Sequence, residues 1–285
     1  MAVSIGAALS APQLVLYSLI AVGMAANSLG GAGGPLAVYI ITIIAAECGK
    51  IVSRETKVDI LVTPAVTILT GCGLAALCAP AIGAAASAVG DLIKWATNLQ
   101  PFLMGMLVSV AVGMALTLPI SSAAICAALS LTGLAGGAAV AGCCAQMVGF
   151  AVISYRDNGA GGLISQGLGT SMLQMPNILR NPRIWIAPTL ASAVTGPLAT
   201  CLFHLEMNGP AVSSGMGTCG LVGQIGVYTG WLNDIAAGTR AAILPMDWLG
   251  LALICFVLPA ALSWSFCWAL RRMGWVKPGD MKLGE

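Results

Sequence analysis

The chain has 285 residues, of which 58% are hydrophobic and only 8% are charged. An ordinary soluble domain carries roughly 25% charged residues, and a chain of this size cannot cover a water-facing surface with so few. The same balance excludes intrinsic disorder, which needs low hydrophobicity and high charge. A net charge of +2 without a basic stripe gives no reason to expect nucleic acid as a partner. The composition predicts an integral membrane protein surrounded by membrane lipid.

The chemistry-bearing residues give no sign of an enzyme or a metal site. The ten cysteines lie almost all in apolar runs, form no CxxC pair, and have only one histidine to complete a zinc site. No phosphate-binding loop, nucleophile elbow or HExxH sequence is present. We therefore expect no catalytic residue in this chain, no cofactor and no metal ion.

The intervals between charged residues define the predicted membrane spans, because a spanning helix needs about 20 largely apolar residues. Two spans precede the first charged cluster, and a third follows it directly. The uncharged interval 95–155 has room for three helices, and two further spans follow a polar, glycine-rich segment. The predicted single spans are residues 12–29, 35–48, 60–80, 184–203 and 248–270.

The basic clusters predict the topology, since loops rich in Lys and Arg face the cytoplasm. Clusters at 50–57, 156, 180–183 and 271–282 all face inward only if an even number of helices separates each pair. This requirement predicts an all-α polytopic fold of about eight transmembrane helices with both termini in the cytoplasm. The number rises to ten if the glycine-rich segments 159–177 and 207–228 also cross.

A faint internal repeat is visible within what is otherwise a single transmembrane domain, 1–285. Residues 60–71 and 184–196 each carry a proline near the start and close on Thr-Gly. Duplication is common in secondary transporters, with the substrate site between the repeats. The possible halves are 1–155 and 156–285. The alternative is a chance match, because Ala, Gly and Pro are abundant throughout the chain.

Two polar segments, 161–177 and 204–224, stand out from the apolar sequence, and both contain Gly-(Leu/Met)-Gly-Thr-(Ser/Cys). Glycine-rich backbone with hydroxyl and amide side chains predicts a pair of re-entrant loops around a hydroxylated solute. Close helix packing through small residues is the alternative. The candidate solute-binding residues are Gln166, Thr170, Ser171, Gln174 and Asn177 in the first segment, and His204, Glu206, Asn208, Thr218 and Gln224 in the second.

His204 and Glu206 allow two interpretations, because both follow a 20-residue apolar span. They either line the solute cavity and bind hydroxyl groups, or mark a helix end at the non-cytoplasmic interface, where charge costs little.

Residues 169–177, 181–200 and 215–224 resemble the enzyme IIC-type membrane proteins of the bacterial phosphotransferase system, in the perfringolysin O regulator-like branch. The resemblance implies an all-helical, homodimeric inner-membrane protein that moves sugars or related solutes. It also implies separate IIA and IIB phosphocarrier subunits, because no soluble relay domain is present here. Cys219 stands where the family pattern leads us to expect Ser, and His204 where we expect a basic residue.

The predicted function is therefore a permease of the enzyme IIC type, which moves a sugar, polyol or small hydroxylated solute by alternating access. One alternative is a membrane-embedded sensor that binds such a solute without moving it. Another is an ion-coupled secondary transporter that uses Glu206 or Asp59 as its coupling site.

Overall fold

The computed structural model describes residues 1–55, 58–97 and 99–284, and the regular structure within these ranges is helical. The one extended pairing among them is an isolated bridge between Gly133 and Met207. The prediction of an all-α polytopic membrane protein is confirmed. The chain divides into two compact units, one formed by Met1–Ala88 with Pro119–Ser121 and the other by Val89–Leu118 with Ser122–Glu285.

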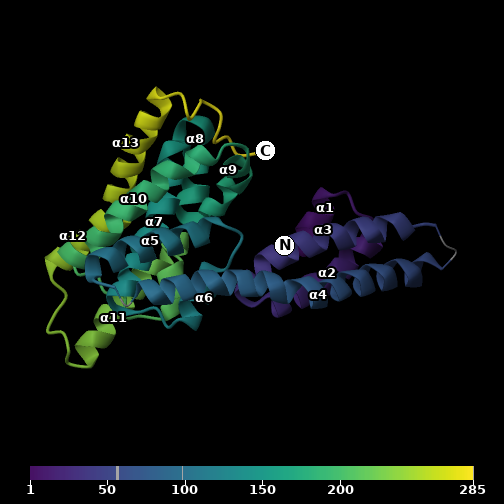
Figure 1. The fold of residues 1–285 in the computed structure, drawn as a ribbon, viewed down its shortest axis with the longest axis horizontal. Helices are drawn as coiled ribbons and strands as arrows, with labels where there is room; N and C mark the ends of the chain where they lie inside the picture. The colour runs from purple at the N-terminus through teal and green to yellow at the C-terminus, as the bar shows by residue number, and fades with distance from the viewer. Residues whose placement is uncertain (56–57, 98, 285) are drawn as a thin grey trace. The chain divides into compact units, whose positions relative to one another are not determined.

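The first unit contains the first two predicted spans and most of a long third helix (Figure 1). Pro12 precedes α2, and Pro35 lies in the first turn of α3. Proline suits these positions because it has no N–H, and the first N–H groups of a helix have no partner within the helix. Its elements are α1 (Ala2–Ala8), α2 (Gln13–Gly30), η1 (Gly31–Gly33), α3 (Gly34–Val52) and α4 (Asp59–Ala96) as far as Ala88.

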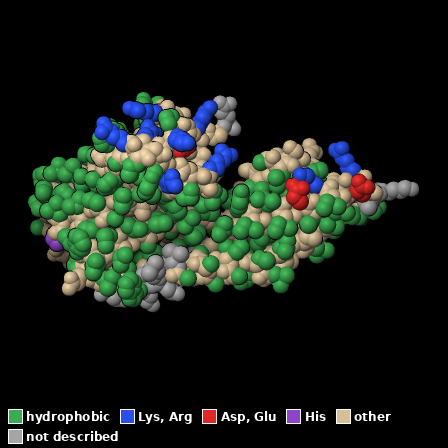
Figure 2. Space-filling model, turned by 45° about the horizontal axis from the view of Figure 1, so that its top comes forward, with side chains coloured by type: hydrophobic (Ala, Val, Ile, Leu, Met, Phe, Trp, Pro, Cys, Tyr) green, Lys and Arg blue, Asp and Glu red, His purple; other side chains and the backbone are tan. Residues whose placement is uncertain are grey.

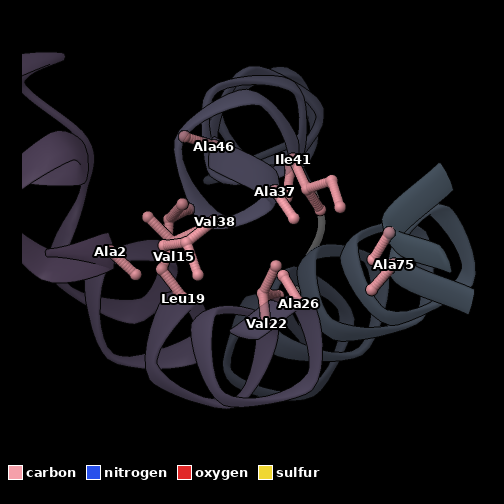
Figure 3. Close-up of a cluster of buried hydrophobic side chains, with 12 residues drawn as sticks. Ala2, Val15, Leu19, Val22, Ala26, Ala37, Val38, Ile41, Ala46 and Ala75 are labelled. Atoms are coloured by element: carbon pink, nitrogen blue, oxygen red, sulfur yellow. The ribbon is translucent and has the colours of Figure 1, made fainter. Parts of the chain in front are cut away.

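Small side chains fill the interior of the first unit, which lets its helices approach closely (Figure 3). Four of the labelled residues in that cluster come from α2, and the rest come from α1, α3 and α4. The fully buried members are Val15, Leu19, Val22, Ala26, Ala37, Ala45, Ala46, Ala75 and Ala79.

The second unit carries the remaining helices and both glycine-rich segments. Its elements are α5 (Pro101–Thr117), α6 (Ser122–Ala128), α7 (Gly133–Ile153), α8 (Tyr155–Ile164), η2 (Ser165–Gly169), η3 (Ser171–Gln174), α9 (Met175–Arg180), η4 (Pro182–Trp185), α10 (Ile186–Pro197), η5 (Leu198–Leu202), η6 (Ala211–Gly215), η7 (Cys219–Leu221), α11 (Val222–Ala236), α12 (Pro245–Ala252), η8 (Leu253–Val257) and α13 (Leu258–Arg272).

Helix α7 is the central element of the second unit, with 89% of its most apolar window buried. It packs against α5, α10 and α13. Gly142 of α7 lies so close to the carbonyl of Ser109 on α5 that an added Cβ would collide with it, and Gly196 of α10 stands in the same relation to Gly105. These contacts explain why α5, α7 and α10 are rich in Gly, Ala and Ser.

Six helices in the described part of the chain are long and apolar enough to cross a membrane, and α5 is a shorter apolar helix. Two predictions of helix ends need correction. The span expected at 60–80 continues to Ala96, because Pro80 sits within α4 without ending it. The interval 95–155 holds α5, α7 and the seven-residue α6, which at roughly 10 Å is too short to cross. The total of eight crossings stays a prediction.

Basic side chains gather at one end of the second unit (Figure 2). Arg271, near the end of α13, donates from Nη2 to the carbonyl of Ile153 at the end of α7, at 3.0 Å. The guanidinium carbon of Arg183 lies 5.3 Å from the ring centroid of Trp275. We call this the basic end. Arg183 and Arg271 both lie there, and the even number of crossings predicted between them stays a prediction.

Candidate functional site

The two glycine-rich segments meet in the second unit. The first segment forms a π-helical turn, η2, and the second forms a 3-10 turn, η7, and these two turns pack against each other. η2 also packs against α7. The sequence placed the polar residues in two separate loops, and the fold brings the loops together.

Helix α7 orders the candidate residues by depth, since each of its residues adds about 1.5 Å along its axis. Gly133 marks the end opposite the basic end, and Cys144 and Met147 mark the middle, about 16–21 Å further along. Ser154 follows directly at the basic end. Candidate residues contact α7 or its flanking residues at each of these three levels, which we call the outer, middle and basic-end levels.

At the outer level, Met207 bridges to the start of α7 through paired backbone bonds of 3.0 Å with Gly133. Leu205 and Met207 are buried, whereas His204 and Glu206 are exposed. His204 also has a left-handed backbone, with φ of 44°. The alternation of buried and exposed residues over 205–207 turns Glu206 away from the core.

A hollow of about 350 Å³ lies at this level, lined by Glu206, Asn208, Asp234, Thr239 and Arg240. The amide nitrogen of Asn208 donates to Asp234 at 2.9 Å and to Glu206 at 3.3 Å. Arg240 forms an ion pair with Asp247. Glu206 and Asn208 therefore share one polar hollow, and His204 is not among its lining residues.

At the middle level, Thr218 and Gln224 of the second segment contact sulfur atoms of α7. The hydroxyl of Thr218 donates to Met147 Sδ at 3.6 Å, and Gln224 Nε2 donates to Cys144 Sγ at 3.2 Å. Gln224 is 8% exposed, and its Oε1 is buried without a partner among the described residues. A buried amide oxygen left unpaired is costly, so it points to a ligand or a water at this position.

Gly217 explains how the second segment comes so near α7. Its φ is 53°, and an added Cβ would lie 2.6–2.9 Å from atoms of Cys143 and Cys144. Gly169, in the matching place of the first segment, has no neighbour within 4 Å of an added Cβ. The two motifs are therefore alike in sequence and different in conformation.

A second group of polar side chains at the middle level surrounds Gln146 of α7. It lies on another face of the helix than Cys144, since residues two apart in a helix are rotated by about 200°. Ser171 and Thr117 share a hydrogen bond of 2.9 Å, and Thr117 donates to Gln146 Oε1 at 3.3 Å. Gln146 also accepts from Trp185 Nε1 at 3.0 Å and donates to Thr189 at 3.3 Å. This group joins α5, α7 and α10 to the first segment.

Gln146 is a residue that the sequence reasoning missed. It is wholly buried and hydrogen-bonds to the side chains of Thr117, Trp185 and Thr189, so it positions the first segment. The signal was available, because Gln146 is the lone amide in the uncharged interval 95–155 apart from the residues near its start.

At the basic end, the first segment forms a chain of buried amides. Gln166 Nε2 donates to Ser154 Oγ at 2.8 Å, and Gln174 Nε2 donates to Gln166 Oε1 at 2.9 Å. Asn177 Nδ2 then donates to Gln174 Oε1 at 2.9 Å. Gln166 and Gln174 are fully buried and Asn177 is 7% exposed. Three candidate residues therefore form one amide ladder.

The C-terminal segment, residues 275–283, lies against this ladder, and we call it the strap. Gln174 donates to the carbonyl of Met281 at 3.0 Å, and Asn177 donates to that of Lys282 at 3.0 Å. Asn158 of α8 holds the residues on either side of Lys282. It donates to the carbonyl of Met281 and accepts from the backbone N–H of Leu283, at 2.8 Å in each case. The sequence analysis described this segment only as basic, so its docking was not predicted.

Thr170, the remaining candidate, acts locally. Its hydroxyl accepts from the backbone N–H of Met172 at 3.1 Å and so caps the 3-10 turn η3. Within the described residues, no group of three or more His, Cys, Asp or Glu side chains could hold a metal ion.

A polytopic helical protein with polar side chains at three levels along a buried central helix has the general build of a membrane permease. The sequence matches the family described as "Phosphotransferase system, EIIC" over residues 1–283, and the chain belongs to that family. It is thus a multi-pass membrane protein and, in general terms, a phosphotransferase-system sugar permease that works with other components of that system. No curated protein and no solved structure matches the chain.

Proposed function

We propose that the chain binds a sugar, polyol or similar hydroxylated solute at the middle level of α7 and passes it across the inner membrane by alternating access. The observation that carries the proposal is the unpaired, buried Oε1 of Gln224 beside the contact of the two glycine-rich turns. A solute hydroxyl would donate to that oxygen, and Thr218 would supply a second hydroxyl contact.

The other two levels are then the two mouths of the pathway. The hollow at Glu206 and Asn208 is the outer mouth, and the amide ladder under the strap closes the inner one. Gln174 and Asn177 would contact the solute only after the strap has left, because strap carbonyls now accept from their N–H groups. Gln166 would be freed with them, since its Oε1 accepts from Gln174. Ser171 and Thr170 would hold the first segment in place.

The basic end faces the cytoplasm in this proposal, as the positive-inside rule requires. The C-terminus, which lies at that end, is then cytoplasmic, and so is the N-terminus if the number of crossings is even. The cytoplasmic phosphocarriers IIA and IIB would be separate subunits that phosphorylate the solute there. We propose a homodimer, on the strength of the family resemblance.

The ion-coupled alternative has less support from the side chains that it would use. Asp59 already accepts from the backbone N–H of Arg54 at 2.8 Å and from Thr63 Oγ1 at 2.5 Å, and it is the first residue of α4, where a carboxylate complements the helix dipole. Glu206 is exposed at the outer mouth. The sensor alternative differs from the permease only in lacking flux.

The test is uptake of a panel of radiolabelled hexoses, hexitols and pentitols into membrane vesicles that contain phosphoenolpyruvate and the general phosphotransferase proteins. We expect one solute to accumulate as its phosphate ester, and Gln224→Leu and Thr218→Val to abolish this. The matched control is Thr229→Val on α11, whose hydroxyl bonds to its own helix at Ile225 O, 2.7 Å.

The outcomes separate the alternatives. Unaltered uptake in Gln224→Leu would overturn the placement of the solute. Accumulation of free solute that collapses with the proton or sodium gradient would favour the ion-coupled transporter. Binding by the purified protein without any flux would favour the sensor.

A further inference from the structure

A second hollow in the structure has no part in the solute pathway. It has a volume of about 500 Å³ and lies at the basic end, between the end of α7 with α8 and the last turns of α13. Its lining combines arginines with aromatic and aliphatic side chains, namely Val152, Ile153, Tyr155, Arg156, Leu163, Trp264, Cys267, Trp268 and Arg271. Neither the ladder nor the strap contributes to it, so it requires its own explanation.

The two arginines give the hollow an unsatisfied positive charge. Arg271 donates from Nη2 to Ile153 O, but its Nε is buried without a partner among the described residues. Arg156 is exposed and forms no ion pair within the described part of the chain. No carboxylate lines the hollow. Asp157, next in sequence, accepts from Gly279 N at 3.1 Å through Oδ1 and leaves Oδ2 unpaired.

The walls of the hollow are apolar and open outward. Trp264 and Trp268 stand one helical turn apart on the same face of α13, and they are 56% and 49% exposed. Arg272 extends the positive surface along this face, with its guanidinium carbon 4.0 Å from the ring centroid of Trp268. Leu163 of α8 is 38% exposed on the opposite wall.

This hollow also lies at a particular depth. α12, η8 and α13 together form an apolar stretch, Pro245–Arg272, that is long enough to cross a membrane, and the arginines stand at its end. Tryptophan, tyrosine and arginine at the end of a span are typical of the headgroup region of a bilayer. A basic pocket between spanning helices at that depth suits an anionic lipid headgroup.

We propose that the hollow is a binding site for one anionic phospholipid. The phosphate would accept from Arg271 Nε and from Arg156, and an acyl chain would lie along Trp264, Trp268 and Leu163. A free phosphate shares the headgroup chemistry but leaves the exposed tryptophans and Leu163 uncovered, whereas a phospholipid covers both. The bound lipid would hold α13 against the end of α7, directly before the strap begins.

The experiment measures phospholipid bound to the delipidated, full-length protein by native mass spectrometry. Phosphatidylglycerol is the probe, phosphatidylcholine is the neutral comparison and glycerol 1-phosphate is the soluble competitor. We expect one phosphatidylglycerol per protomer to be retained in preference to phosphatidylcholine. Its apparent affinity should fall at least fivefold in Arg156→Gln and in Arg271→Gln.

Arg180→Gln is the matched control, because Arg180 is exposed at the same end and does not line the hollow. Arg156→Gln keeps the test decisive if Arg271→Gln fails to fold, since Arg156 is exposed and has no ion pair to lose within the described residues. Equal retention of the two lipids, or an Arg156→Gln protein that binds phosphatidylglycerol as tightly as the unaltered one, would overturn the proposal. Displacement of the lipid by millimolar glycerol 1-phosphate would overturn it in favour of a site for free phosphate esters.

Discussion

The two glycine-rich segments share a motif and a composition, yet the fold uses them differently. In the first, the amides of Gln166, Gln174 and Asn177 bond to one another and to the strap. In the second, Gln224 has one bond to a sulfur atom and an oxygen with no partner among the described residues. Polar residues in an apolar chain are therefore not one class, because some complete the structure and others are left open for a ligand.

The glycines of the two motifs should show the largest difference. Gly217→Ala places a Cβ against the backbone of Cys143 and Cys144 at a φ of 53°, whereas Gly169→Ala meets nothing within 4 Å. We expect Gly217→Ala to lose about 3 kcal/mol of stability, which combines left-handed strain with a backbone clash. Gly169→Ala should stay within about 0.5 kcal/mol of the unaltered protein.

Thermal unfolding of the detergent-solubilised protein, followed by the fraction that stays monodisperse, measures both changes. An equal loss of thermal stability in the two variants would mean that the two motifs have equivalent conformations, and the contrast between the segments would be wrong.

A substitution in the amide ladder should cause the second-largest loss of stability. Gln174→Leu leaves the buried Gln166 Oε1 unpaired and removes one of the two bonds made by Asn177 Nδ2 and one of the two accepted by the carbonyl of Met281. Buried groups left unpaired cost about 1–3 kcal/mol, so we expect a loss of about 2–3 kcal/mol. Gln224→Leu is the counterpart in the second segment and should cost less than about 1 kcal/mol, because it loses one bond to sulfur.

Unfolding curves in one detergent compare the two amide variants directly. A Gln224→Leu protein that is less stable than Gln174→Leu would reverse the assignment of roles, and Gln224 would then be the structural residue.

A substitution that loosens the strap should have a smaller effect, confined to the strap itself. Asn158→Ala removes the two 2.8 Å bonds that hold Met281 and Leu283 but leaves the ladder intact. We expect the strap to open about tenfold more often, since about 1.4 kcal/mol corresponds to a factor of ten. Hydrogen exchange of the Gly279 amide reports this opening, because its bond to Asp157 is not altered by the substitution. The exposed Asn233 of α11 supplies the control, Asn233→Ala, in which strap exchange should not change.

The sequence predicted the general organisation because charge and apolar length act directly on a chain in a bilayer. The gaps between basic clusters located α2, α3, α10 and α13, and the composition of residues 161–177 and 204–224 located both irregular segments. Helix ends were less predictable, as α4 shows by continuing past Pro80, because neighbouring packing decides whether a proline ends a helix.

The site was predictable as a set of residues but not as an arrangement. Nothing in the sequence says that Gln174 faces Met281, more than a hundred residues away, while Gln224 faces Cys144. Such pairings depend on long-range packing. The strap was missed for the same reason, since it gains its importance from partners distant in the chain. Gln146 could have been singled out as a lone amide in an apolar interval, but its partners could not.

The smallest effect is expected at the outer mouth, where Glu206→Gln replaces an exposed carboxylate. Its hydrogen bond from Asn208 is long, at 3.3 Å, and its level on α7 is about 16 Å from that of Gln224. An exposed polar contact of this kind contributes about 0–0.5 kcal/mol, so both stability and solute uptake should change less than about twofold. Uptake kinetics at two pH values measure this. If Glu206→Gln abolishes uptake and removes its pH dependence, then the carboxylate couples transport to a proton, and the outer mouth rather than the middle level is where the chemistry of transport takes place.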